Sequence, residues 1–295
     1  RLGMGGMSIL GARTTNLHDF STKATPWDNN YGVVQGMSNQ SWFHYDSAVL
    51  LPIDLTAASV TSDWMLRIGG GLALHPDYFS TTMAPIPSNI LAYSRFSGAT
   101  SGASHAWQVA SPLLADPRMH PDGVLLANGD ILVLGGDKAL ATPTTPPVRV
   151  NYGEIIDGSN LSVRYQTPPA EGRGYHSTAV LLDDGRVLYG GGELRVTDYQ
   201  IYRPDYFSKV RPKINSAPAV ISYGSSFSLG YEFAGDGLAY VERAALIRPG
   251  SVTHHFDADQ RYLKLAPHTS LPWPENGMTT SAPADKRAAP PGYYM

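Results

Sequence analysis

Apolar and polar positions alternate along most of the chain in short runs, a pattern that predicts β-strands rather than helices. The clearest unit is an apolar run, a polar turn, a second apolar run and a pair of glycines. This unit occurs three times, at residues 44–71, 119–137 and 172–193. The turns at Asn128-Gly129 and Asp184-Gly185 carry residue pairs typical of tight β-hairpins. Each copy therefore predicts a β-hairpin.

The hairpins belong to a longer repeat. A Tyr-bearing third run follows each glycine pair, at residues 89–96, 150–157 and 198–204. The markers Gly69, Gly135 and Gly190 recur about every 55 to 66 residues, near the period of about 50 that is typical of kelch repeats. Each kelch repeat forms one four-stranded blade of a β-propeller, so three blades are predicted. An ordinary β-sandwich with similar hairpins is the alternative.

Three blades do not close a propeller, which needs about four to eight. Residues 37–205 supply the three, and residues 1–36 are expected to hold the remnant of another. Because an open propeller exposes strand edges, we expect the missing blades upstream in a longer protein or on another chain. A first residue of arginine, without an initiator Met, fits that expectation. The predicted first domain is a propeller fragment over residues 1–205.

The glycine-pair pattern stops after this fragment. Residues 206–295 contain short alternating runs that are typical of a small sandwich. We therefore predict a second, truncated immunoglobulin-like domain over residues 206–295.

Composition supports an all-β protein and excludes some functions. Hydrophobic residues make up 42% of the chain and charged residues 16%, with 30 Gly, 23 Pro and 17 Tyr, which favours strands and tight turns. A net charge of −3 gives no reason to expect nucleic acid as a partner. No apolar run approaches the roughly 20 residues of a transmembrane helix. The chain has no cysteine, which excludes disulfides and thiolate metal sites within it.

Four segments, in this order, resemble the copper radical oxidases, the galactose oxidase and glyoxal oxidase family. They are "GRGYHSTAVLLDDGRVLYGGG", "YQIYRPDYFSKVRPKI", "RAALIRPGSVTHHFDADQRYLKL" and "PPGYYM". The likeness covers about residues 37–295. Members of that family have a seven-bladed kelch propeller followed by an immunoglobulin-like domain. The resemblance therefore implies an all-β chain with part of such a propeller and then a sandwich.

The resemblance also implies a copper site. In the family two histidines and two tyrosines hold one copper ion. By motif match, Tyr175 corresponds to the axial tyrosinate that takes the substrate proton, and His176 and His254 correspond to the histidines. Imidazole nitrogen and tetragonal N,O coordination suit Cu(II). The second tyrosine of the family is bonded to a cysteine in an early blade, so the Cys–Tyr radical cofactor is expected only from an upstream segment.

Further residues have weaker assignments. Arg118 matches a substrate-contacting arginine of the family, and a salt bridge that links blades is its alternative role. His120 is expected near the same pocket. Tyr45 has the equivalent place in the first hairpin and is interpreted as structural, because the cross-linked tyrosine of the family lies in an earlier blade. Adjacent residues of an extended loop face opposite sides, so only one of His254 and His255 would face the copper, and the Thr-His pattern of the family selects His254.

The polar residues after this loop, Asp257, Asp259, Gln260 and Arg261, are interpreted as fixing its shape. The implied function is oxidation of a primary alcohol or aldehyde by O2, giving H2O2, in a secreted protein. A small alcohol, aldehyde or carbohydrate is the expected substrate. The alternative is a non-catalytic kelch-propeller protein, structural or carbohydrate-binding, of the cell wall or an extracellular assembly. An upstream cysteine and copper at Tyr175 would favour the oxidase.

Overall fold

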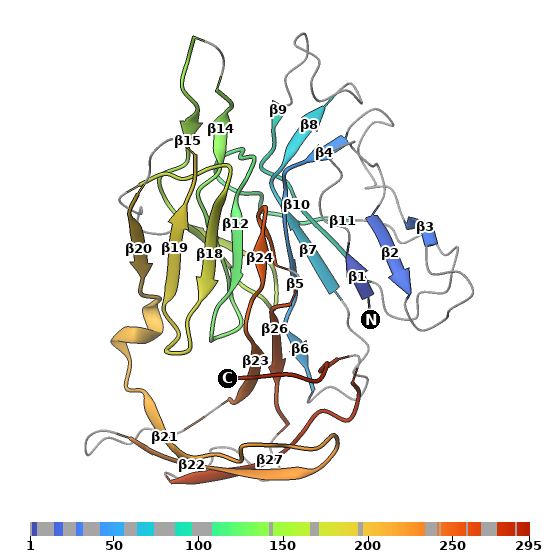
Figure 1. Cartoon of the computed structure of the whole chain (residues 1–295), viewed down its shortest axis with the longest axis vertical. Helices are drawn as coiled ribbons and strands as arrows, with labels where there is room; N and C mark the ends of the chain where they lie inside the picture. Colours follow the sequence, from blue (N-terminus) through green and yellow to red (C-terminus); the bar gives the residue numbers. More distant parts are fainter. Residues whose placement is uncertain are drawn as a thin grey trace.

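The computed structural model is nearly all β (Figure 1). It describes residues 45–55, 64–71, 86–94, 108–141, 144–164, 171–193, 197–233, 241, 243–257, 259–266, 276–286 and 288–295, and the backbone alone of 2–4, 15–19, 28–31, 42–44, 72–73, 95 and 165. In these ranges the helical structure is one 3-10 turn, η1 (Asp205–Ser208). No helix of the described chain is long and apolar enough to span a membrane.

Three groups of antiparallel strands follow one another along the chain, each with its strands in sequence order, and the first group shares its sheet with a C-terminal hairpin. The first contains β5 (Ser47–Leu50), β7 (Trp64–Ile68), β10 (Leu91–Arg95) and β11 (Gln108–Val109). The second contains β12 (Asp122–Leu125), β13 (Ile131–Leu134), β16 (Glu154–Ile156) and β17 (Val163–Tyr165). The third contains β18 (Ser177–Leu181), β19 (Val187–Gly191) and β20 (Tyr199–Tyr202). They coincide with the three predicted repeats, the third with three strands among the described residues where four were predicted, and the first strand β12 lies beside both β5 and β18.

The glycine pairs mark the same backbone corner in every blade. Two consecutive left-handed glycines follow the second strand of the first and second blades, beginning at Gly69 (φ 65°) and Gly135 (φ 59°). In the third blade the pair begins at Gly191 (φ 72°), one residue after the marker Gly190 chosen from the sequence. A Cβ atom on Gly135 would overlap the Arg173 carbonyl oxygen. Glycine is required there both by the left-handed backbone and by this close approach.

Smaller sheets surround the blades. Residues 1–36, predicted to hold a blade remnant, contain an antiparallel sheet of β1 (Leu2–Met4), β2 (Thr15–Asp19) and β3 (Asp28–Tyr31). At the upper end in Figure 1 lie β4 (Trp42–His44), β8 (Gly71–Ala73) and β9 (Ile86–Pro87), and the pair β14 (Asp137–Ala139) and β15 (Val148–Arg149).

The C-terminal region forms a sandwich that is continuous with the first blade. One sheet contains β21 (Pro212–Ser216), β22 (Ser226–Phe233) and β27 (Gly277–Ser281). The other contains β23 (Ala245–Arg248), β26 (Arg261–Lys264) and the short β6 (Ile53–Asp54), which comes from the first blade. In addition, Met295 exchanges two backbone hydrogen bonds with Ile247 in β23. The boundary at residues 205 and 206 stays a prediction.

A hairpin of the C-terminal region enters the propeller. It consists of β24 (Val252–Thr253) and β25 (Phe256–Asp257), and Phe256 pairs in parallel with Ala48 of β5. Figure 1 shows β24 between β12 and β5. The largest apolar core likewise crosses both regions: it joins Val124, Leu132 and Ile156 of the second blade to Ile247 and Tyr262 of the sandwich. Burial of this shared core holds the two regions together.

Candidate functional site

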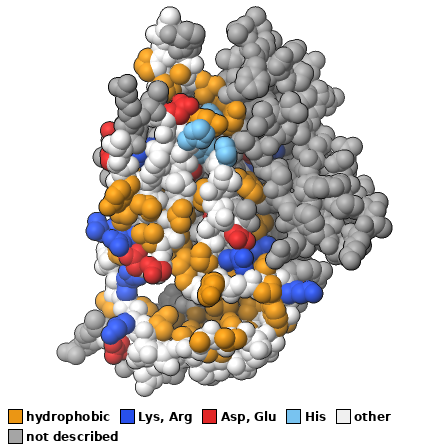
Figure 2. All heavy atoms as spheres, viewed as in Figure 1, with side chains coloured by type: hydrophobic (Ala, Val, Ile, Leu, Met, Phe, Trp, Pro, Cys, Tyr) orange, Lys and Arg blue, Asp and Glu red, His pale blue; other side chains and the backbone are white. Residues whose placement is uncertain are grey.

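Six aromatic and imidazole side chains lie together where the hairpins of the three blades meet the C-terminal hairpin. This tyrosine–histidine cluster consists of Tyr45, His120, Tyr175, His176, His254 and His255. Figure 2 shows histidine side chains gathered at one place on the molecular surface. The cluster therefore combines nitrogen and phenol oxygen donors from four separate stretches of the chain.

The three predicted copper ligands are all in this cluster. The rings of Tyr175 and His176 stack with their centroids 3.8 Å apart. The His254 ring lies 5.8 Å from that of His176 and 6.4 Å from that of Tyr175. Thr253 Oγ1 forms a 2.8 Å hydrogen bond with Nδ1 of His254, so Nε2 is the nitrogen left for a metal. Tyr175 is half-buried, whereas His176 and His254 are exposed.

The repeat explains why side chains from three blades converge. Tyr45, His120 and His176 each stand at the corner before a first strand, with φ of 53°, 56° and 64°. The His120 N–H donates to the Tyr45 carbonyl oxygen at 2.8 Å, which links two of these corners directly. A left-handed residue other than glycine costs roughly 1–2 kcal/mol. Such conformations persist where the surrounding structure enforces them, and they concentrate at functional sites.

His254 and His255 form the whole turn of the C-terminal hairpin. Their φ angles are 51° and 66°, as in the two-residue turn that favours Asn-Gly. The expectation of an extended loop was therefore wrong, because the chain reverses within these two residues. The two side chains nevertheless have different surroundings: His254 is exposed, while His255 is 1% exposed.

Two carboxylates lie behind the cluster. Asp137 Oδ2 lies 2.8 Å from Nδ1 of His120, and Asp122 Oδ1 lies 3.0 Å from Nδ1 of His255. Burial lowers the pKa of His120, and the hydrogen bond of its ring to Asp137 opposes this only in part. Carboxylates bound to imidazole in this way fix the ring orientation behind metal sites. Nε2 of both histidines is buried without a hydrogen-bond partner among the described residues.

The type of metal donor is constrained by this arrangement. No group of three His, Cys, Asp or Glu side chains in the described part of the chain is placed to hold a metal ion. A metal at the cluster therefore depends on phenol oxygens as well as imidazole nitrogens. Sequence reasoning missed Asp122, and it considered His255 only as the alternative to His254.

Asp257 fixes the loop as predicted. Its Oδ1 accepts hydrogen bonds from the backbone N–H groups of Ser251 at 3.0 Å, Asp259 at 3.0 Å and Gln260 at 2.9 Å. Arg261 Nη1 donates to the Ala288 carbonyl oxygen at 3.3 Å. These bonds hold the C-terminal hairpin from behind and confirm a structural role for the polar run.

Arg118 is fully buried and forms an ion pair with Glu154. Its Nη1 donates to the Gly135 carbonyl oxygen at 3.2 Å. Arg173 repeats the arrangement in the next blade, where its Nη1 donates to the Gly191 carbonyl oxygen at 2.7 Å. This repetition and burial favour a structural ion pair over a substrate contact for Arg118, and its partners Glu154 and Gly135 both belong to the middle blade.

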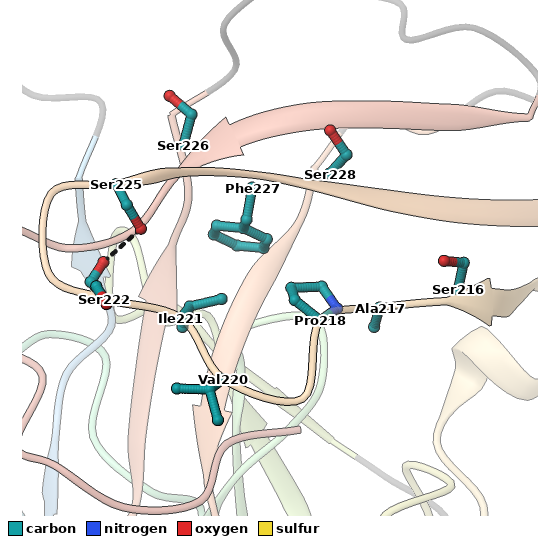
Figure 3. Close-up of a pocket in the computed structure, with 10 residues that line it drawn as sticks. All are labelled: Ser216, Ala217, Pro218, Val220, Ile221, Ser222, Ser225, Ser226, Phe227 and Ser228. Carbon is teal, nitrogen blue, oxygen red and sulfur yellow. Dashed lines mark hydrogen bonds between the residues drawn. The ribbon is translucent and has the colours of Figure 1, made fainter.

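A surface groove lies in the sandwich rather than in the blades (Figure 3). It has a volume of about 510 Å³ and is lined by Ser216, Ala217, Pro218, Val220, Ile221, Ser222, Ser225, Ser226, Phe227 and Ser228. Its lining residues include neither an ionisable side chain nor a histidine. The tyrosine–histidine cluster is therefore the better candidate for chemistry.

Known proteins match different parts of the chain. Residues 211–295 match the family described as galactose oxidase-like, Early set domain. The chain is 29% identical over 202 residues to "Aldehyde oxidase GLOX" of Vitis pseudoreticulata, covering 60% of this chain and 38% of that protein. It is 29% identical over 201 residues to galactose oxidase of Gibberella zeae, covering 66% and 29%. It is 30% identical over 220 residues to "Putative aldehyde oxidase Art an 7" of Artemisia annua, covering 65% and 36%.

The chain thus spans about a third of the length of these relatives. Among solved structures, it is similar to a fungal alcohol oxidase of the AA5 family in complex with copper, with a TM-score of 0.71 and 22% identity. That match covers 96% of this chain and 56% of the other, and it supports the propeller-and-sandwich fold. Together, the Early set match over residues 211–295, the relatives and the fold support the resemblance of this chain to the copper radical oxidases, the galactose oxidase and glyoxal oxidase family.

Proposed function

We propose that the protein containing this chain oxidises a primary alcohol or an aldehyde with dioxygen at a copper site. The observation that carries the proposal is the meeting of Tyr175 and His176, from the third blade, with His254 from the C-terminal hairpin. Two regions of the chain contribute donors to one place.

The residues present fit copper. Two imidazoles and a phenol oxygen make a nitrogen and oxygen donor set that suits Cu(II). Thr253 orients His254 through Nδ1, as outer hydrogen bonds do for metal-bound imidazoles. Once bound, copper would supply positive charge beside the substrate oxygen and accept one electron.

Tyr175 is the residue to which we assign proton transfer. A nearby cation favours the phenolate form of tyrosine, and a phenolate at this position accepts the hydroxyl proton of an alcohol. Conversion of the alcohol to an aldehyde releases two electrons and two protons, which reduce O2 to H2O2. The second redox partner lies outside this chain: residues 1–295 contain no cysteine, so a Cys–Tyr cofactor has to come from another segment.

Activity of the complete protein tests the proposal. After copper loading, peroxide release is measured with galactose, simple primary alcohols and glyoxal-type aldehydes, which also identifies the substrate class. Tyr175→Phe is expected to lower turnover about 100-fold or more, because a general base contributes roughly 10²–10⁴-fold. Tyr199→Phe, which removes an exposed phenol, serves as the matched control.

The absence of peroxide release would also be informative. A copper-loaded, folded wild-type protein that releases no peroxide with any of these substrates would contradict the oxidase. It would support the non-catalytic propeller protein. An extracellular location is part of the same proposal and is tested by fractionating the source cells.

A further inference from the structure

Asp122 contacts two of the elements that build the cluster. It is 1% exposed and begins β12, the first strand of the middle blade. Its Oδ2 accepts a hydrogen bond from Ser177 Oγ at 2.6 Å, and its Oδ1 lies 3.0 Å from Nδ1 of His255. One carboxylate thus binds a residue of the third blade and a residue of the C-terminal hairpin.

The two partners of Asp122 are the chain neighbours of the two predicted copper histidines. Ser177 directly follows His176, and His255 directly follows His254. Because a residue and its neighbour share a peptide plane, holding Ser177 and His255 also restricts the positions of His176 and His254. We propose that Asp122 is a positioning residue that sets the separation of His176 and His254.

The backbone at both histidines needs such support. His176, His254 and His255 all have left-handed φ angles, of 64°, 51° and 66°, which residues other than glycine seldom adopt. Hydrogen bonds to an ionised carboxylate are about twice as strong as neutral ones. Both oxygens of Asp122 are engaged and the side chain is buried, so it acts through its neighbours rather than on a substrate.

The hairpin has a second attachment that does not involve the third blade. Ser47 Oγ donates to the His255 carbonyl oxygen at 2.7 Å and accepts from the Gly123 N–H at 3.0 Å. Ser47 therefore holds the turn against the first and second blades. Asp122 adds the bond to Ser177, which connects the hairpin to the blade that carries His176.

Asp122→Asn in the complete protein tests the proposal, which rests on the proposed function for its copper measurements. The amide keeps the shape of the carboxylate but loses its charge and one acceptor oxygen. Glu154→Gln is the matched control, because Glu154 is another buried carboxylate of the middle blade, and its described partners, Arg118 and the Ala115 N–H, are not members of the cluster. The three measurements are copper affinity, the Cu(II) EPR spectrum and hydrogen exchange of a peptide covering residues 251–257.

We expect Asp122→Asn to weaken copper binding about 10- to 100-fold, as loss of outer partners of metal ligands does. The EPR hyperfine splitting is expected to change, and exchange of residues 251–257 to become about tenfold faster or more. Glu154→Gln is expected to melt at a lower temperature while all three measurements stay as in the wild type. Ser177→Ala, which removes one of the two bonds, is expected to alter the EPR spectrum and leave the hairpin exchange unchanged.

Unchanged copper affinity, EPR spectrum and hairpin exchange in Asp122→Asn would overturn the proposal and leave the proposed function intact. If the wild type binds no copper, the proposed function is wrong. Hydrogen exchange of residues 251–257 in Asp122→Asn then tests by itself whether Asp122 holds the hairpin in place. If Asp122→Asn does not fold, the Ser177→Ala variant tests the proposal instead. An EPR spectrum of Ser177→Ala identical to that of the wild type would then overturn the proposal.

Discussion

The side-chain amide of Gln260 binds both backbone polar groups of Leu125. Its Nε2 donates to the Leu125 carbonyl oxygen at 2.9 Å, and its Oε1 accepts from the Leu125 N–H at 2.8 Å. Gln260 follows the C-terminal hairpin and is 3% exposed, while Leu125 ends β12. The side-chain amide thus makes the two hydrogen bonds that a neighbouring strand would make with Leu125. These bonds attach the C-terminal region to the middle blade.

Replacing Gln260 with alanine is expected to lower the free energy of unfolding by about 2–5 kcal/mol. The substitution leaves two buried backbone groups unpaired, and each costs about 1–3 kcal/mol. Urea unfolding of the complete protein measures the loss. Gln108→Ala is the control, because Gln108 is exposed and bonds only to the Tyr93 hydroxyl among the contacts described for it. Equal losses in both variants would contradict the role given to Gln260.

Adding a single methyl group at Gly135, the glycine at the corner of the middle blade, is expected to destabilise the fold strongly. A Cβ atom on Gly135 would overlap the Arg173 carbonyl oxygen and the Tyr189 hydroxyl. Gly224 has a similar φ of 67°, but nothing among the described residues lies within 4 Å of its Cβ position. We expect Gly224→Ala to cost about 1 kcal/mol for the left-handed backbone alone. Gly135→Ala is expected to cost several times more in thermal unfolding, and similar losses would be evidence against the close packing.

Arg118 is predicted to stabilise the fold and not to contact substrate. Truncating one partner of a buried ion pair costs about 3–5 kcal/mol, so Arg118→Met is expected to lower the free energy of unfolding by this amount. In the proposed oxidase reaction, the KM of the folded variant is expected to stay as in the wild type. Arg164→Met, which removes an exposed pair with Asp130, is expected to cost about 1 kcal/mol or less. A raised KM in Arg118→Met without loss of stability would restore the substrate-contact assignment.

Tyr189 predicts a loss of stability in alkaline solution. Burial raises the pKa of Tyr189 above its ordinary value, and the charge of Asp122 adds to the shift. Above about pH 10 the unfolded chain therefore releases this proton while the folded chain keeps it. The folded state then binds more protons, so stability falls with rising pH by up to about 1.4 kcal/mol per pH unit.

Tyr189→Phe removes the ionisable phenol, so the free energy of unfolding is expected to fall less steeply with rising pH than in the wild type. The free energy of unfolding from pH 8 to pH 11 measures it. Tyr199→Phe removes an exposed tyrosine and leaves Tyr189 in place, so its loss is expected to be as steep as in the wild type. An identical slope in Tyr189→Phe and the wild type would show that the buried phenol does not cause the loss.

Local patterns predicted the blades because hairpin turns and glycine corners are encoded in adjacent residues. Asn128-Gly129 identified a turn correctly, and the third glycine corner was misplaced by one residue, at Gly190 rather than Gly191. The family motifs pointed to Tyr175, His176 and His254. Their meeting in space depends on the C-terminal hairpin entering the propeller, which follows from tertiary packing.

Other features of the site were not predictable from local sequence. Asp122 resembles an ordinary turn residue, and its bond to His255 joins positions 133 residues apart in the chain. The left-handed corners at His120 and His176 are uncommon for any residue other than glycine, so local sequence did not predict them. Arg118 was matched by motif to a substrate contact, and its partner Glu154 lies 36 residues further along the chain, outside the local pattern.

Cu(II) EPR of the complete protein, with nitrogen couplings resolved, tests the central claim most directly. The wild type is expected to bind one copper per chain with couplings from two imidazoles. His176→Ala and His254→Ala are each expected to lose one imidazole coupling and to bind copper much more weakly. If His254→Ala kept both couplings and the wild-type affinity, the C-terminal hairpin would not contribute to the copper site and the account would be wrong.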